Sequence, residues 1–93
     1  MSRILIVDDH PQNRDYLCTL LQAHGHDMQS AANGAEALAL ARAAPPDLVI
    51  SDLLMTVLDG YSLLREWRAD PQLQALPFIV YTATYTEEED ERL

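Results

Sequence analysis

Asp47-Leu48-Val49-Ile50-Ser51-Asp52 is the stretch of sequence that decides the fold. Its centre, Leu48–Ile50, is a short run of apolar, largely β-branched residues that follows the prolines Pro45-Pro46. Such a run predicts a strand that is buried on both faces. The strand ends on a carboxylate. Because ligands of open parallel sheets bind outside the carboxyl ends of the strands, Asp52 is the candidate reactive group.

Two other apolar runs also predict strands with polar side chains at their ends. Arg3–Val7 is followed by the acids Asp8-Asp9, and Phe78–Tyr81 is followed by the hydroxyl of Thr82. A weaker strand is predicted at Asp27–Ala31, because the chain has to return from the helix before it. Carboxylates or a hydroxyl therefore follow three of the predicted strands.

The segment after the first strand has the pattern of a helix. We expect this helix to start at Pro11, because proline suits the first helical turn, and to end at Gly25, because glycine suits the position after a helix. Its apolar face is expected to comprise Leu17, Leu20, Leu21 and His24.

Composition and spacing predict the other helices. After the turn signal Asn33-Gly34, the alanine-rich segment Ala35–Ala43 has high helix propensity. A third helix is indicated by residues with the spacing of one buried face, namely Gly60, Leu63, Leu64 and Trp67. Thr86, with Glu89 three residues later, forms a capping-box pattern at the start of a further helix.

Strands and helices thus alternate along the chain. This order predicts a parallel sheet with helices on both faces. Right-handed crossovers and the switch-point rule bring the ends of the first, third and fourth strands to one edge of the sheet. The side chains expected to meet there are Asp8, Asp9, Asp52 and Thr82.

Three carboxylates in one place repel one another unless a cation lies among them. Oxygen ligands without histidine or cysteine suit a hard ion such as Mg²⁺. Beside such an ion an aspartate can attack a phosphoryl group and form an aspartyl phosphate, while Thr82 donates its hydroxyl to a phosphoryl oxygen. The alternative is that acids at strand ends only cap the N-termini of neighbouring helices.

Length and composition limit the class of protein. The 93 residues suffice for one small domain or part of one, and a hydrophobic share of 48% is typical of a folded chain. The net charge of −9 argues against direct binding of nucleic acid. The sequence has a single cysteine, no apparent signal peptide and no apolar run that could span a membrane, so we expect a cytoplasmic protein.

Motifs along nearly the whole chain match one family in their order and spacing. They are Ile4–Asp9, Asn33–Leu38, Pro46–Asp52, Met55 with Asp59-Gly60, and Pro77–Ala83. Together they resemble the receiver domain of two-component response regulators. The resemblance implies a flavodoxin-like doubly wound parallel sheet of order 2-1-3-4 over residues 1–93. The family's fifth strand and last helix are expected beyond Leu93.

The resemblance also implies roles for particular residues. Asp52 would be the phosphoacceptor, Asp9 a direct ligand of Mg²⁺, and Asp8 a second acid that holds the ion through water. Other positions implied around the ion or the phosphoryl group are Leu54 (backbone carbonyl), Met55, Thr82 (switch hydroxyl) and Ala83 (room beside the phosphoryl group). The phosphodonor would be a phosphohistidine on a histidine kinase or phosphotransfer protein, and the chain would not be an enzyme acting on a separate substrate.

Two departures from the family pattern leave alternatives open. Thr56 stands where the family usually has proline, which removes a fixed φ but no ligand. The family's conserved lysine is expected beyond Leu93, and the chain contains no lysine. A receiver-shaped domain that works without phosphorylation is therefore a second reading. An aspartate-nucleophile phosphatase of the haloacid-dehalogenase type is less favoured, because it needs a second aspartate where Leu54 stands.

Two further expectations concern the surface of the domain. His10 follows the acids, and we expect it to be a loop residue without a role; the alternative is that it tunes access to the acidic cluster. Without a fifth strand, Phe78–Thr82 would expose an apolar sheet edge, which pairs readily with another chain. We therefore expect the 93-residue chain to form a homodimer.

Overall fold

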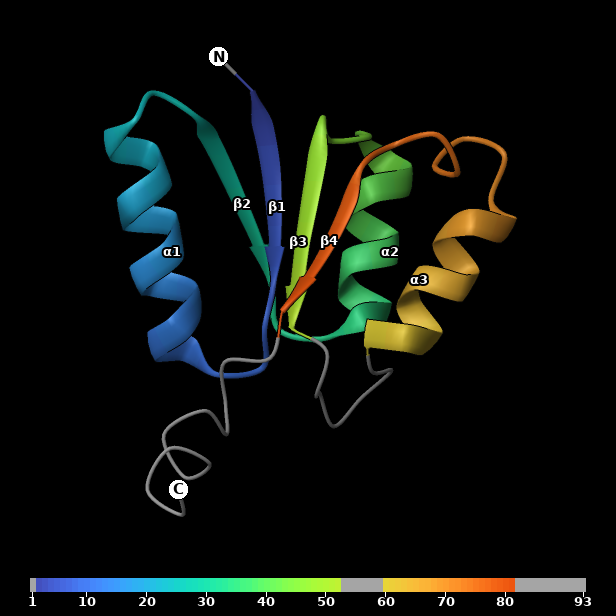
Figure 1. Cartoon of the computed structure of the whole chain (residues 1–93), viewed down its shortest axis with the longest axis horizontal. Helices are drawn as coiled ribbons and strands as arrows, with labels where there is room; N and C mark the ends of the chain where they lie inside the picture. The colour runs from blue at the N-terminus through green and yellow to red at the C-terminus, as the bar shows by residue number, and fades with distance from the viewer. Residues whose placement is uncertain (1, 53–59, 82–93) are drawn as a thin grey trace, which may run out of the picture.

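The computed structural model describes residues 2–52 and 60–81. Its elements in chain order are β1 (Arg3–Val7), α1 (Pro11–Ala23), β2 (Asp27–Ala31), α2 (Gly34–Ala43), β3 (Leu48–Asp52), α3 (Gly60–Ala69) and β4 (Phe78–Tyr81). The strands form one parallel sheet in the order β2-β1-β3-β4, as the sequence predicts. Helix α1 covers one face, and α2 and α3 cover the other (Figure 1).

The register of the sheet brings the ends of three strands together. Val7 pairs with Ser51, and Asp52 pairs with Tyr81. At the opposite end of the sheet, the Arg3 N–H donates to Asp47 Oδ2 at 2.8 Å and the Asp47 N–H donates to the Arg3 carbonyl at 2.8 Å. These bonds fix β1 beside β3, so the acids that follow each strand lie at the same edge.

Helix α1 ends as the sequence predicts. Gly25 has a φ of +90°, and its N–H donates to the Gln22 carbonyl at 2.9 Å. The His26 N–H reaches back to the Leu21 carbonyl at 3.3 Å, which completes a Schellman motif. Glycine adopts this left-handed conformation without the steric cost that a Cβ atom would add.

The predicted apolar face of α1 is wrong at two positions. Leu20 is 42% exposed and His24 is exposed, whereas Leu17 and Leu21 are half-buried. A single helix lying on a sheet buries only a narrow stripe of its surface, and no residue of α1 is fully buried. Periodicity identified the side of the helix, but not how much of that side the sheet covers.

The core lies mainly between the sheet and the helices α2 and α3. Its buried members include Leu5, Val7, Ala37, Leu38, Ala41, Val49, Leu63 and Trp67. Leu73, in the connection after α3, is also fully buried, and its position was not predicted. The core therefore includes Leu63 and Trp67 of the predicted face of α3, together with residues of α2 and one residue from a loop.

Two sequence predictions near the core need correction. Leu48 and Ile50 are only half-buried, so β3 is not buried on both faces. Ile50 lines a pocket with Asn13, Tyr16 and Leu17 of α1. Leu48, two residues earlier on the strand, lies on the same face of the sheet as Ile50. Helix α2 begins at Gly34 rather than Ala35, because the Asn33 side chain accepts from the Glu36 N–H at 2.8 Å and caps the helix one residue earlier.

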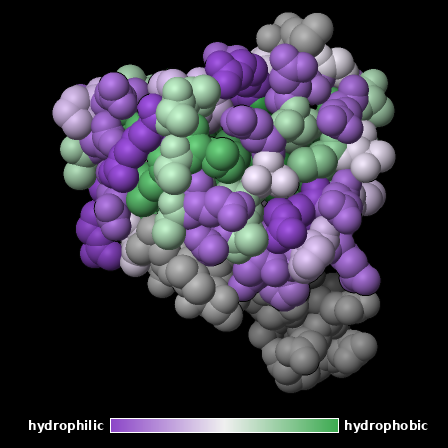
Figure 2. All heavy atoms as spheres, turned by 180° about the vertical axis from the view of Figure 1, so that it is seen from behind, coloured by the Kyte–Doolittle hydropathy of each residue, from purple (hydrophilic) through white to green (hydrophobic). Residues whose placement is uncertain are grey.

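The face of the molecule seen in Figure 2 carries many hydrophilic residues. Seen from behind, hydrophobic residues gather toward the middle of the face, between hydrophilic ones (Figure 2). Within residues 2–52 and 60–81, no helix is long and apolar enough to cross a membrane.

Candidate phosphoacceptor and metal site

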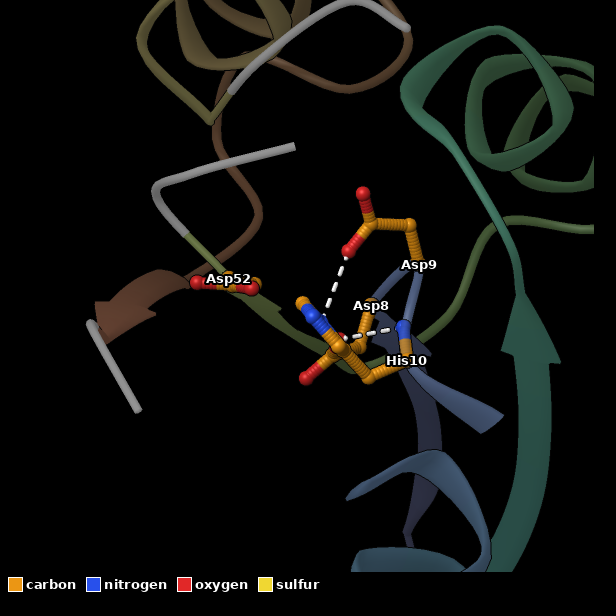
Figure 3. Close-up of side chains that lie close together, drawn as sticks. All are labelled: Asp8, Asp9, His10 and Asp52. Carbon is orange, nitrogen blue, oxygen red and sulfur yellow. Dashed lines mark hydrogen bonds and ion pairs between the residues drawn. The ribbon is translucent and has the colours of Figure 1, made fainter. Parts of the chain in front are cut away.

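Three carboxylates meet at the carboxyl ends of β1 and β3. Asp8 and Asp9 follow β1, and Asp52 is the last residue of β3. Asp8 and Asp52 are fully buried, whereas Asp9 is partly exposed. Together with His10, each of these residues offers one ligand atom, and the four atoms lie within 4.8 Å of one another (Figure 3). The structure thus brings together the described acids that the sequence singled out.

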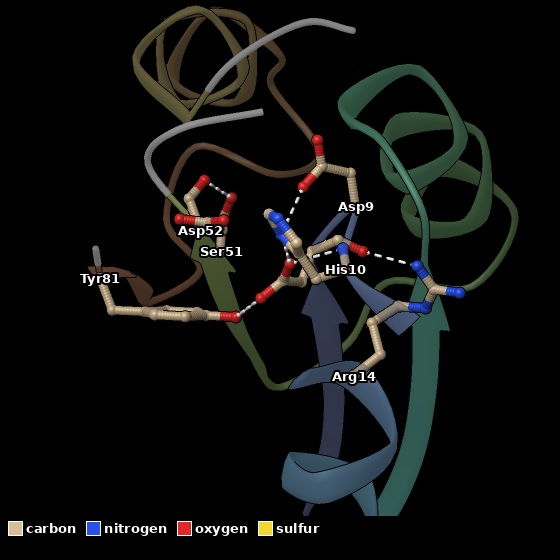
Figure 4. A network of polar contacts seen from close by, with 7 residues as sticks. Asp9, His10, Arg14, Ser51, Asp52 and Tyr81 are labelled. Carbon is tan, nitrogen blue, oxygen red and sulfur yellow. Dashed lines mark hydrogen bonds and ion pairs between the residues drawn. The ribbon is translucent and has the colours of Figure 1, made fainter. Parts of the chain in front are cut away.

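Asp8 is held at both of its carboxylate oxygens. Its Oδ1 accepts a hydrogen bond from the His10 N–H at 2.8 Å, at the start of α1. Its Oδ2 accepts a hydrogen bond from the Tyr81 hydroxyl, which comes from the end of β4 (Figure 4). The bond to Oδ1 comes from the N-cap residue and not from an N–H within α1, so helix capping accounts for neither oxygen of Asp8.

His10 lies between two of the acids. Its Nδ1 is 2.9 Å from Asp9 Oδ1 and 3.2 Å from Asp8 Oδ1 (Figure 3). The side chain is 51% exposed, so the ring lies where the cluster opens to solvent. His10 lies outside the helices and strands, as the sequence predicts, but its contacts with Asp8 and Asp9 were not predicted. The ring reaches back over the acids because His10 is the extended N-cap residue of α1.

The electrostatics of the site are dominated by negative charge. Burial raises the pKa of the Tyr81 phenol, and the hydrogen bond to Asp8 and the charges of Asp8, Asp52 and Asp9 raise it further. Tyr81 is therefore a neutral donor in this site. Arg14 extends its Nη1 to the backbone carbonyl of Asp8 at 2.7 Å, so its guanidinium is bound to the main chain of the strand end.

The donor set of the cluster fits a hard divalent cation. Carboxylate oxygens are the ligands that Mg²⁺ prefers, and two of the three carboxylates here are fully buried. Burial of several like charges is costly unless an opposite charge compensates it. Asp8, Asp9 and Asp52 are therefore suited to hold Mg²⁺, and the nitrogen of His10 is the one donor in the group that departs from an all-oxygen set.

Some predicted site residues cannot be placed. Leu54, Met55, Thr82 and Ala83 lie outside the described residues. What the structure does describe is the backbone that leads to them. The Ser51 hydroxyl donates to the Asp52 carbonyl at 3.0 Å inside the protein, which fixes the end of β3. Tyr81, directly before Thr82, pairs with Asp52 across the sheet.

Sequence reasoning missed the part that Tyr81 takes in this site. It counted this residue only as the last apolar position of a strand. A signal was present, because an amphipathic tyrosine at the carboxyl end of a buried parallel strand needs a partner for its hydroxyl. The partner itself, 73 residues away in the sequence, could not be read from the pattern.

The alternation of strands and helices and the order of the parallel sheet define a flavodoxin-like domain. The acidic cluster at its switch point is compatible with binding of a metal ion. The sequence model of the response regulator receiver domain matches residues 4–93. The chain therefore belongs to the response regulator receiver family.

Curated relatives agree with this assignment. Protein PilH of Pseudomonas aeruginosa is 42% identical over 82 residues, which cover 88% of this chain and 68% of PilH. The DNA-binding regulator RpaA of Synechocystis is 36% identical over 83 residues, which cover 89% of this chain and 34% of RpaA. The chain thus spans between about a third and about two thirds of the length of these relatives.

Solved structures show the same fold. The N-terminal domain of a response regulator receiver protein from Methanoculleus marisnigri has a TM-score of 0.87 at 35% identity, covering 98% of this chain and 76% of that one. The chemotaxis response regulator CheY4 of Vibrio cholerae has a TM-score of 0.85 at 33% identity, covering 98% of this chain and 76% of that one. Both share its receiver architecture.

Proposed function

We propose that this chain is a cytoplasmic phosphoacceptor module that takes a phosphoryl group onto Asp52, with Mg²⁺ held by the acidic cluster. The donor would be a phosphohistidine on a histidine kinase or phosphotransfer protein, the partners with which receiver domains interact. The observation that carries the proposal is the convergence of a fully buried Asp52 with Asp8 and Asp9, within 4.8 Å, in a domain of this family.

The proposed reaction transfers a phosphoryl group from a histidine nitrogen of the donor to a carboxylate oxygen of Asp52. A carboxylate oxygen of Asp52 attacks the phosphorus, the O–P bond forms, and the N–P bond to the donor histidine breaks. The electron pair of that bond returns to the imidazole nitrogen, which then accepts a proton. When bound, Mg²⁺ neutralises negative charge on the transferring oxygens.

Residues of this chain prepare the site for that transfer. Asp9, beside the opening of the cluster, would bind the ion directly, and Asp8, buried beneath it, would hold it through water. The fixed end of β3 keeps the Asp52 carboxylate beside them. Leu54, Met55, Thr82 and Ala83 keep the roles that the resemblance implies, as a carbonyl ligand, a loop residue, a switch hydroxyl and a small neighbour of the phosphoryl group.

We propose that the chain is not an enzyme with a separate substrate. Its only catalytic activity would be its own phosphorylation and slow dephosphorylation. A phosphatase of the haloacid-dehalogenase type is less favoured, because that family has a second aspartate where this chain has Leu54. A receiver-shaped interaction domain that is never phosphorylated is the alternative to test.

The test is incubation of the purified chain with Mg²⁺ and acetyl phosphate, a small phosphodonor, followed by intact mass spectrometry. We expect the mass of one added phosphoryl group, which disappears in Asp52→Asn and when the ion is chelated. Asp15→Asn, at an exposed position on α1, is the matched control and should be phosphorylated. Phosphorylation of Asp52→Asn to the same extent, or none in the natural chain, would contradict the proposal.

A further inference from the structure

Tyr81 makes a contact with the acids that the proposed function does not use. Its ring is half-buried at the end of β4, and its hydroxyl donates to Asp8 Oδ2 across the end of β3 (Figure 4). Strand β4 is not adjacent to β1, from which Asp8 extends, because β3 lies between them. This hydrogen bond therefore joins the ends of two strands that do not pair.

We infer that Tyr81 is a positioning residue for the metal site: its hydroxyl fixes the Asp8 carboxylate in the orientation that holds the ion. This inference rests on the proposed function, since it requires that the cluster binds Mg²⁺. The inference gives Tyr81 a part in ion binding. Neither the sequence motifs nor the roles implied by the family resemblance assign it one.

The geometry around Asp8 supports this role. With Oδ2 held by Tyr81, Oδ1 is the oxygen that lies beside His10 Nδ1, which is itself 2.9 Å from Asp9 Oδ1. The Tyr81 bond to Oδ2, together with the His10 N–H bond to Oδ1, fixes the orientation of the Asp8 carboxylate beside Asp9. Carboxylates near a metal are commonly oriented by such hydrogen bonds, and loss of one typically lowers metal affinity by about 10- to 100-fold.

The surroundings of the ring explain why the hydroxyl is well placed. Tyr81 lines a mainly apolar pocket of about 420 Å³ together with Asn13, Tyr16, Leu17 and Ile50. These residues come from α1 and β3, so the ring borders a pocket formed with two elements that also flank the acids. The bond to Asp8 is present before the ion binds, and a donor that is fixed in advance loses little entropy on binding.

The first experiment compares Mg²⁺ binding by calorimetry in the natural chain, Tyr81→Phe and Tyr16→Phe. We expect Tyr81→Phe to weaken binding by about tenfold, because it keeps the ring and removes only the donor. Tyr16 lines the same pocket and is 66% exposed, and Tyr16→Phe should bind as the natural chain does. Equal affinity in all three proteins, or equal losses in the two variants, would overturn the inference.

A double-mutant cycle tests whether Tyr81 acts through Asp8. In an Asp8→Asn background the Tyr81→Phe change should have little further effect on the dissociation constant of Mg²⁺. A purely structural role would instead change the unfolding midpoint in chelator and leave the affinity of the folded protein unchanged. A full tenfold loss in the Asp8→Asn background would show that Tyr81 does not act through this carboxylate, and so would overturn the inference.

A measurement on the unaltered protein covers the case in which Tyr81→Phe does not fold. The ring signals of ¹³C-labelled tyrosines are followed by NMR during a Mg²⁺ titration, and the Tyr81 signal is assigned by elimination of the other tyrosines. We expect that signal to move as the ion binds, and an unmoved signal at saturation would overturn the inference. If the natural chain shows no heat of Mg²⁺ binding, the proposed function is wrong. If the natural chain binds Mg²⁺ and the Tyr81 signal does not move, only the inference about Tyr81 is wrong.

Discussion

The indole ring of Trp67 meets the ring of Phe78 edge to face, with centroids 5.4 Å apart and planes inclined at 67°. Trp67 lies on α3 and is fully buried, and Phe78 is the first residue of β4. The contact therefore joins the third helix to the strand that carries Tyr81 toward the acids. Edge-to-face pairs of this kind add to the stability that burial alone supplies.

Replacement of Trp67 by alanine is expected to destabilise the domain strongly. Loss of a buried aromatic side chain typically costs about 3–5 kcal/mol, which is a large part of the stability of a domain this small. Urea unfolding followed by circular dichroism measures the change. Glu66→Ala, exposed on the same helix, serves as the control, and an equal loss in the two variants would show that the Trp67 packing contributes little.

If the acidic cluster binds Mg²⁺, substitutions of Asp9 and Asp15 should differ in their effect on Mg²⁺ affinity. Asp9→Ala should weaken Mg²⁺ binding far more than Asp15→Ala, because Asp9 belongs to the cluster and Asp15 is exposed on α1. Calorimetry on the folded variants provides the comparison. Indistinguishable dissociation constants in the two variants would remove Asp9 from the ion site.

The lifetime of the phosphorylated state is predicted from residues 54 and 84. Leu54 is apolar and Thr84 is short, so neither offers an acid or amide that positions an attacking water. We therefore predict slow self-hydrolysis and a shorter half-life in Leu54→Asn, measured by the decay of the phosphorylated mass. A half-life that is unchanged or longer in Leu54→Asn would contradict the prediction.

The pair formed by Asp70 and Arg42 predicts a change in stability at acid pH. Arg42 Nε donates to Asp70 Oδ2 at 2.9 Å, and this hydrogen bond, followed by that from the Gln72 N–H, lowers the Asp70 pKa below its ordinary value of 3.8. A lowered folded-state pKa contributes stability that is complete above pH 3.8 and is lost as the pH falls through the folded-state value.

Asp70→Asn should therefore unfold at a lower temperature than the natural chain near neutral pH, with a difference that shrinks toward low pH. Thermal melts at a series of pH values measure this difference. Asp27→Asn, at an exposed position at the start of β2, is the control. If the difference in unfolding temperature between the natural chain and Asp70→Asn stays constant from neutral to strongly acid pH, it does not arise from the ionisation of Asp70 and the prediction is wrong.

The edge of the sheet predicts self-association of the 93-residue chain. Within the described residues β4 pairs only with β3, and its Ile79 and Val80 are 50% and 41% exposed. An exposed apolar edge strand pairs readily with a second copy. Sedimentation at several concentrations should show a dimer that Ile79→Lys weakens, and a monomer over the whole range would refute the expectation.

The sequence by itself determined the order of the elements and the acids at the strand ends. Periodicity and turn residues are local properties, so the apolar run before Asp52, the glycine after α1 and the buried face of α3 could be read directly. The switch-point rule then sufficed to predict that Asp8, Asp9 and Asp52 meet, because the ends of parallel strands share one edge.

Only the tertiary structure decided which side chains complete the site and how far each face is covered. The Tyr81 bond to Asp8 depends on the register of three strands and on a particular ring orientation, over a sequence separation of 73 residues. The exposure of Leu20 and the partial exposure of Ile50 depend on what packs beside them. Contacts of this kind are set by the mutual packing of elements, which the pattern within any single element does not contain.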